Sequence, residues 1–122
     1  MEVVSFEIAK KLKEKGFRER TLSMYLESVK LPHTPLIYYL KDWNKEDNCY
    51  SAPTISQVLK WLREEKKIFI DIRTSIDLNG KEHFSYYIIY NKVSIREGYT
   101  DFDWKFEQAA LAGIEYVLDN LI

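Results

Sequence analysis

The side chains in this chain that could do chemistry are few and lie far apart. His33 and His83 are the two histidines, and neither belongs to a metal-ligand spacing such as H-x-x-x-H. Zinc is typically held by three or four convergent ligands, and nothing in the sequence singles out carboxylates to join a histidine and Cys49. We therefore expect both histidines to be surface or half-buried residues, and we expect no metal and no cofactor.

Nucleophilic catalysis is also poorly supported. Cys49 is the single cysteine, and the neighbouring acidic residues Glu46 and Asp47 should raise the pKa of its thiol rather than activate it. Asp101 and Asp103 could pair as acid and base, but two aspartates before a helix more often cap it. The chain also lacks the glycine-rich phosphate-binding motifs and the G-x-S-x-G nucleophile motif. We therefore expect a protein that is not an enzyme.

Charge gives little support for nucleic-acid binding. The 18 basic and 19 acidic residues leave a net charge of -1, whereas a nucleic-acid-binding domain usually carries a basic excess or stripe. Acidic residues interrupt the one basic cluster, so we interpret it as a solvated helix face followed by a charged turn. Its members are the weak candidates for a basic patch: Lys10, Lys11, Lys13, Arg18 and Arg20.

Aromatic residues are the remaining anomaly, notably the pairs Tyr38-Tyr39 and Tyr86-Tyr87. Aromatics on a sheet can stack exposed RNA bases, but packing in a core or interface is the commoner role. The helix–hairpin–helix order of the C-terminal part is also that of the double-stranded RNA-binding fold. That fold needs a lysine-rich start to its last helix, and DFDWKFEQ is acidic here.

The stretch SAPTISQVLKWLREEKKIFIDI, residues 51–72, contains a helix start, a helix and a strand. Thr54 and Gln57 have the spacing of a capping box, in which each side chain binds the backbone N–H of the other residue. We expect Thr54→Ala to cost about 1 kcal/mol of stability. From Ile68 onward the hydrophobic period changes from that of a helix to that of a strand.

Asn79-Gly80 indicates a β-hairpin with two available registers. A two-residue turn places Ile70 opposite Ile89 and sets Asp77 against Glu82. A three-residue loop with Gly80 in a bulge places Ile70 opposite Ile88 and sets Asp77 against Lys81. We predict the bulged register because it pairs opposite charges and separates an apolar face from a polar one.

The bulged register also predicts a contact surface. The face turned away from the helices then carries Phe69, Tyr87 and Ile89 among polar residues. A contiguous exposed apolar patch usually marks a contact. We therefore expect these three side chains to be covered by the N-terminal segment or by a second copy of the chain.

Three other segments complete the predicted elements. Ser5 should cap a helix that ends before Gly16 and Phe17 in a Schellman motif. Residues 21–31 fit a strand slightly better than a helix. Thr34-Pro35 resembles the start of a short helix reaching Trp43, with an extended segment nearly as well supported. The last helix should begin near residue 103, with Gly113 packed closely on the sheet.

These elements predict a single α+β domain over residues 1–122. It has a looser part at 1–49 and a helix–hairpin–helix unit at 50–122. We expect an antiparallel sheet around a central β-hairpin, with two or three helices packed mainly on one face. The N-terminus does not resemble a secretory peptide, and no apolar run approaches the ~20 residues that span a membrane. Together with the lone cysteine, this favours a cytoplasmic protein.

Three fragments resemble a family of short uncharacterised proteins of gut bacteria that often occur in prophage-like or mobile-element settings. They are FEIAKKLKEKGF, YSAPTISQVLKWLREEKKIFIDI and FEQAALAGIEYVLDNLI. Residues 18–49 match only loosely, and Lys105 stands where the family often has a capping threonine. The resemblance implies an α+β layout and assigns no site residue.

The sequence therefore favours a small cytoplasmic protein that acts by protein–protein contact or self-association, either with an unknown protein partner or as a homodimer. The alternative is a nucleic-acid-binding accessory protein of a phage or mobile element. Salt-sensitive binding to oligonucleotides would separate the two, because phosphate contacts weaken steeply with salt.

Overall fold

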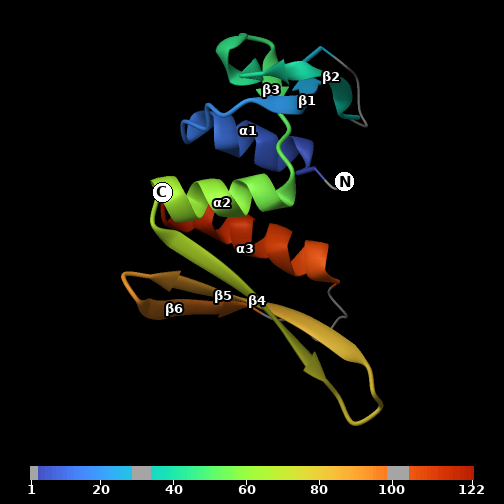
Figure 1. Ribbon diagram of the computed structural model, residues 1–122, viewed down its shortest axis with the longest axis vertical. Helices are drawn as coiled ribbons and strands as arrows, with labels where there is room; N and C mark the ends of the chain where they lie inside the picture. Colours follow the sequence, from blue (N-terminus) through green and yellow to red (C-terminus); the bar gives the residue numbers. More distant parts are fainter. Residues whose placement is uncertain (1–2, 29–33, 99–104) are drawn as a thin grey trace. The chain divides into compact units, whose positions relative to one another are not determined.

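The computed structural model describes residues 3–28, 34–98 and 105–122. Those residues form three α-helices and two three-stranded antiparallel sheets, which confirms the α+β class (Figure 1). The chain divides into two compact units, Met1–Thr54 with Ile122 and Ile55–Leu121. The division falls between Thr54 and Ile55, whereas the sequence placed the looser part at residues 1–49.

The first unit begins with helix α1, Phe6–Glu14. The Ser5 Oγ accepts a hydrogen bond from the Ile8 N–H at 3.3 Å, so Ser5 caps the helix as predicted. Gly16 has φ of +87°, and the N–H of Phe17 donates to the Leu12 carbonyl at 3.0 Å. These are the features of a Schellman motif, and they turn Phe17 into the core, where it is fully buried.

The sheet of this unit has the strand order β2-β1-β3, formed by Leu36–Lys41, Thr21–Leu26 and Cys49–Ser51. The preferred strand at residues 21–31 is confirmed for Thr21–Leu26. The predicted short helix after Pro35 is wrong, because Leu36–Lys41 pairs antiparallel with β1. Its β-branched and aromatic residues suit a strand, and proline is tolerated just before one.

Buried polar contacts fix the connection between β2 and β3, which contains the short 3₁₀ helix Trp43–Lys45 (η1). The Trp43 Nε1–H donates to the Thr21 carbonyl at 3.0 Å. The Asn44 amide donates to the Phe17 carbonyl and accepts from the Ser51 N–H, both at 2.8 Å. Because buried polar groups are costly unless paired, these bonds hold one conformation of the segment.

The second unit runs α2 (Ile55–Glu65), β4 (Ile68–Ile76), β5 (Glu82–Tyr90), β6 (Val93–Gly98) and α3 (Phe106–Asn120). Helix α2 begins directly after Thr54, the position of an N-cap, and the side-chain bonds of the capping box stay a prediction. Ile70 pairs with Ile88, so the bulged hairpin register is confirmed. Gly80 has φ of +79°, and the Asp77 N–H donates to the Lys81 carbonyl at 3.0 Å.

Helices α2 and α3 lie on one face of the sheet β4-β5-β6 (Figure 1). A Cβ atom added to Gly113 of α3 would lie 2.9 Å from the Ile70 Cγ2, which confirms the predicted close approach of helix and sheet. Ile68, Tyr86 and Ile88 are buried beneath the helices. The last helix begins at Phe106, three positions later than the predicted start, and Asp101 and Asp103 lie outside the described residues.

Candidate functional site

The bulged hairpin brings the three predicted contact residues to one face of the second unit. Phe69 and Ile89 are directly opposite each other, and Tyr87 lies opposite Asp71 on the same face. Phe69 is 48% exposed, whereas Tyr87 and Ile89 are half-buried. A shallow hollow of about 430 Å³ lies beside Phe69 and Ile89. The apolar part of this face is therefore small.

Charged groups cover much of Tyr87. The Tyr87 hydroxyl donates to the Glu97 Oε1 at 2.8 Å, and this bond raises the pKa of the phenol. The Arg73 guanidinium carbon lies 3.8 Å from the centre of the Tyr87 ring, and the Arg73 Nε donates to Asp71 at 3.0 Å. Because Arg73 and Glu97 bind other residues of the same sheet, this end of the face is a charged surface rather than an apolar patch.

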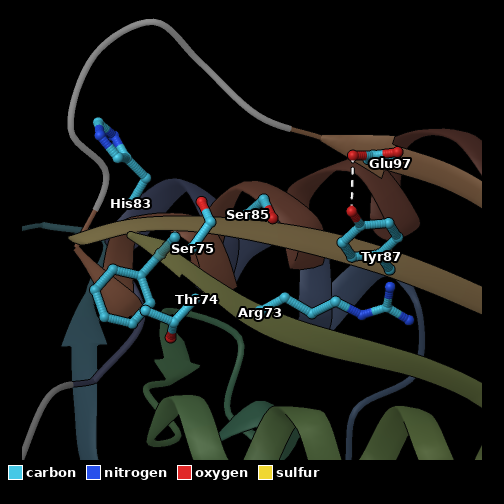
Figure 2. A pocket seen from close by; sticks show the side chains of 8 residues that line it. Arg73, Thr74, Ser75, His83, Ser85, Tyr87 and Glu97 are labelled. Atoms are coloured by element: carbon cyan, nitrogen blue, oxygen red, sulfur yellow. Dashed lines mark hydrogen bonds between the residues drawn. The ribbon is translucent and has the colours of Figure 1, made fainter. Parts of the chain in front are cut away.

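A second hollow, of about 600 Å³, lies over the same sheet (Figure 2). Arg73, Tyr87 and Glu97 line one end, while His83 stands at the other with serine side chains between them. The His83 Nε2 lies 2.9 Å from the Asp77 Oδ2. His83 is thus half-buried, as expected, and binds a carboxylate at the hairpin turn; His33 lies outside the described residues.

The remaining candidate for chemistry is Cys49, at the start of β3. Burial raises the pKa of its thiol, and the Glu46 carboxylate adds to the increase. The sequence had predicted an increase from Glu46 and Asp47, so the direction is confirmed, with burial as the larger cause. Among residues 3–28, 34–98 and 105–122, no group of three or more His, Cys, Asp or Glu could hold a metal ion.

Several members of the basic cluster bind within the first unit. The Lys13 Nζ donates to the carbonyls of Glu46 and Cys49, at 2.7 and 2.8 Å. The Arg18 Nε donates to the Asp42 Oδ2 at 2.9 Å. The Lys10 Nζ lies 5.2 Å from the centre of the Phe6 ring. Lys13 and Arg18 are therefore structural cations, and their contacts reduce what the cluster could offer to phosphates.

Strand β2 carries the largest exposed run of apolar side chains that the structure describes. Ile37 is 79% exposed, and Tyr38, Tyr39 and Leu40 are 58%, 62% and 54% exposed. The pairing of β2 with β1 is irregular at this point, because Lys41 lies opposite Thr21 and Ile37 opposite Ser23, which leaves Tyr38–Leu40 in a bulge. The sequence pattern favours a short helix here, with an extended segment nearly as well supported. Its composition of β-branched and aromatic residues was the signal for a strand.

No protein-family model, no curated protein and no solved structure matches this chain. Within the described residues, no helix is long and apolar enough to cross a membrane.

Proposed function

We propose that this chain is a non-enzymatic cytoplasmic protein that acts by binding another protein chain, and that β2 is its contact strand. The observation that carries the proposal is the exposure of four consecutive large apolar side chains, Ile37–Leu40, on a strand at the edge of its sheet. Exposed apolar patches of this kind mark interaction sites in soluble proteins. The surface predicted from the sequence, around Phe69, is smaller and partly covered by charged groups.

The geometry of an edge strand suits this role. One side of β2 pairs with β1, with a bulge at Tyr38–Leu40, and the other side is an edge of the sheet. A partner chain at this edge could add main-chain hydrogen bonds, while its side chains would cover the exposed apolar side chains of β2. The free thiol of Cys49 is consistent with a reducing compartment.

Site-specific photo-cross-linking tests the proposal. A benzophenone amino acid replaces Tyr39, and the same residue replaces Ile76, which is 68% exposed on β4, as a matched control. After irradiation in the host cell, we expect a protein adduct from position 39 and a much weaker one from position 76. Equal adducts at both positions, or none, would contradict the proposal.

The alternative, a nucleic-acid-binding accessory protein of a phage or mobile element, rests on the exposed rings of Tyr38 and Tyr39, which could stack on bases. It needs cations beside those rings. The Lys41 Nζ is bound to the Glu46 Oε1 at 2.7 Å, and Arg18 is paired with Asp42. Binding to a mixed oligonucleotide pool that weakens steeply with salt would favour this alternative over protein contact.

A further inference from the structure

We propose that the hollow beside Phe69 and Ile89 binds the C-terminal residue of another protein chain, with the apolar side chain in the hollow and the carboxylate at Lys92. The hollow measures about 430 Å³ and is lined by Phe69, Ile70, Asp71, Ile89 and Lys92. A volume near the lower end of the range for ligand pockets suits one side chain rather than a folded surface. The hollow belongs to the second unit, so this site goes beyond the protein contact at β2 and does not depend on it.

The backbone of Lys92 adopts a conformation that its residue type disfavours. Tyr90 pairs with Val93, so Asn91 and Lys92 form a two-residue turn between β5 and β6. Their φ angles are +53° and +62°, as in a type I′ turn, where Asn-Gly is a favoured sequence. Asparagine tolerates this region, whereas lysine is strained in it. The backbone therefore does not explain a lysine at position 92.

Lys67 shows a structural reason for a lysine in the same backbone conformation. It follows α2 with φ of +58°, and its Nζ donates to the Glu64 carbonyl in the last turn of that helix at 2.9 Å. Within the residues that the structure describes, Lys92 makes no hydrogen bond or ion pair. Its exposed side chain instead lines the hollow, where it supplies an uncompensated positive charge.

The strand register orders the groups of the hollow along the sheet. Phe69 and Ile89 lie directly opposite each other and form its apolar part. Lys92 follows Ile89 by three residues, beyond the last pair of β4 and β5, which is Ile68 with Tyr90. Asp71 lies two residues from Phe69 in the opposite direction. A cation therefore stands at one end of an apolar hollow and a carboxylate at the other.

These groups match the chemistry of a peptide C-terminus. A carboxylate at Lys92 would form a charge-assisted hydrogen bond, and an apolar side chain would cover Phe69, which is 48% exposed. The Asp71 carboxylate repels a second anion at its end but can accept backbone N–H groups of the preceding residues. Its Oδ2 also accepts from the Arg73 Nε at 3.0 Å, which compensates part of its charge. A fatty acid has no N–H donor for Asp71, so a peptide is the better match.

An NMR titration of the isotope-labelled chain tests the site. The probe is the peptide Gly-Gly-Ser-Gly-Leu with a free carboxylate, and we expect the largest amide shifts at Phe69, Ile89 and Lys92. The same peptide with a C-terminal amide should bind roughly tenfold more weakly, because it loses the charge-assisted hydrogen bond. Hexanoate has a carboxylate and an apolar chain but no N–H group, so it should also bind more weakly than the peptide.

Two glycine substitutions separate the role of the Lys92 side chain from that of its backbone. Lys92→Gly should remove most of the binding and raise the denaturant midpoint of unfolding, because glycine relieves the strained backbone. Lys67→Gly alters a lysine in the same backbone conformation and is the matched control; it should bind the peptide like the wild type. Phe69→Ser should weaken binding through the apolar part of the hollow.

The contrary outcomes would each overturn the proposal. Equal binding of the acid and amide peptides would show that Lys92 does not hold a carboxylate, and no shifts at millimolar peptide would show that there is no site. Hexanoate that binds as tightly as the peptide would exclude a peptide as the specific occupant. A lower midpoint for Lys92→Gly would show that the lysine stabilises the fold. None of these results bears on the contact at β2, which the cross-linking experiment tests separately.

Discussion

Gly98 leaves room for the ring of Tyr86 in the core of the second unit. It ends β6, lies opposite Tyr86 and is buried. A Cβ atom at this position would fall inside the contact distance of the Tyr86 ring. The same ring also faces Gly113, where an added Cβ would lie 3.2 Å from the Tyr86 Cγ. The two glycines therefore create the space that Tyr86 fills.

We predict that Gly98→Ala lowers the free energy of unfolding by about 2–3 kcal/mol, because overpacking forces ring and backbone apart. Chemical denaturation measures the change. In a Tyr86→Leu background the smaller side chain removes the clash, so the same substitution should cost much less. Equal costs in both backgrounds would show that the Tyr86 ring is not what excludes a methyl group at position 98.

In the basic cluster, a lysine has a structural role that its residue type does not reveal. The residue types of the cluster are those of a phosphate-binding surface, but Lys13 donates to the backbone carbonyls of Glu46, just before β3, and Cys49, the first residue of β3. The nearby Tyr50 ring, whose centre lies 4.9 Å from the Lys13 Nζ, adds a cation–π contact. The charge thus stabilises a loop of its own unit, a role that the sequence pattern did not distinguish from a solvated helix face.

Among the elements, the β4–β5 hairpin is the most locally specified. The Asp77 Oδ1 accepts from the N–H groups of Asn79 and Lys81, at 2.8 and 2.9 Å, and its Oδ2 meets the His83 ring. The His83 hydrogen bond is the largest cause of a lowered pKa at Asp77, and the Lys81 N–H adds to it. The carboxylate therefore holds the three-residue loop in the bulged register.

This arrangement predicts a specific pH dependence. Since the pKa of Asp77 is lower in the folded chain, its ionised form stabilises the fold above the unfolded value of about 3.9. That contribution is lost as the pH falls through the folded pKa. In an NMR titration Asp77 should titrate below pH 3.9, and His83→Gln should move its midpoint upward. A midpoint at or above the ordinary value in the wild type would contradict the prediction.

At the scale of the whole molecule, the chain consists of two compact units, each with its own sheet and buried apolar residues. The second unit is continuous in sequence, from Ile55 to Leu121. Its helices cover one face of a three-stranded sheet, which is enough for many small domains to fold alone.

We predict that a fragment of residues 51–122, which retains Thr54 before α2, folds without the first unit. It should unfold cooperatively on heating and give a dispersed amide NMR spectrum with contacts between Ile70 and Ile88. A fragment of residues 51–104 is the control; without α3 it leaves the face of Ile70 and Tyr86 uncovered, and it should not fold. An unfolded longer fragment would mean that the second unit depends on the first.

Several features of this protein were determined by the sequence alone because their signals are local. The Ser5 cap, the Gly16 turn before Phe17 and the Gly80 bulge each depend on residues within a few positions of one another. The hairpin register followed from charges at the turn and the alternation of apolar residues. The face that carries Phe69, Tyr87 and Ile89 followed from that register.

Only the tertiary structure decided the features that depend on distant partners. Residues after Pro35 could begin a helix or an extended segment, and pairing with β1, which lies beyond the local window of the sequence pattern, selects the strand. The candidate contact surface on β2 was missed for this reason, since exposure of Ile37–Leu40 depends on their place at the edge of the sheet. The carbonyls that bind Lys13 are likewise more than thirty residues away. The local sequence pattern limits which secondary structures a segment can form. The free energy of pairing with distant residues and of burial then favours one of them.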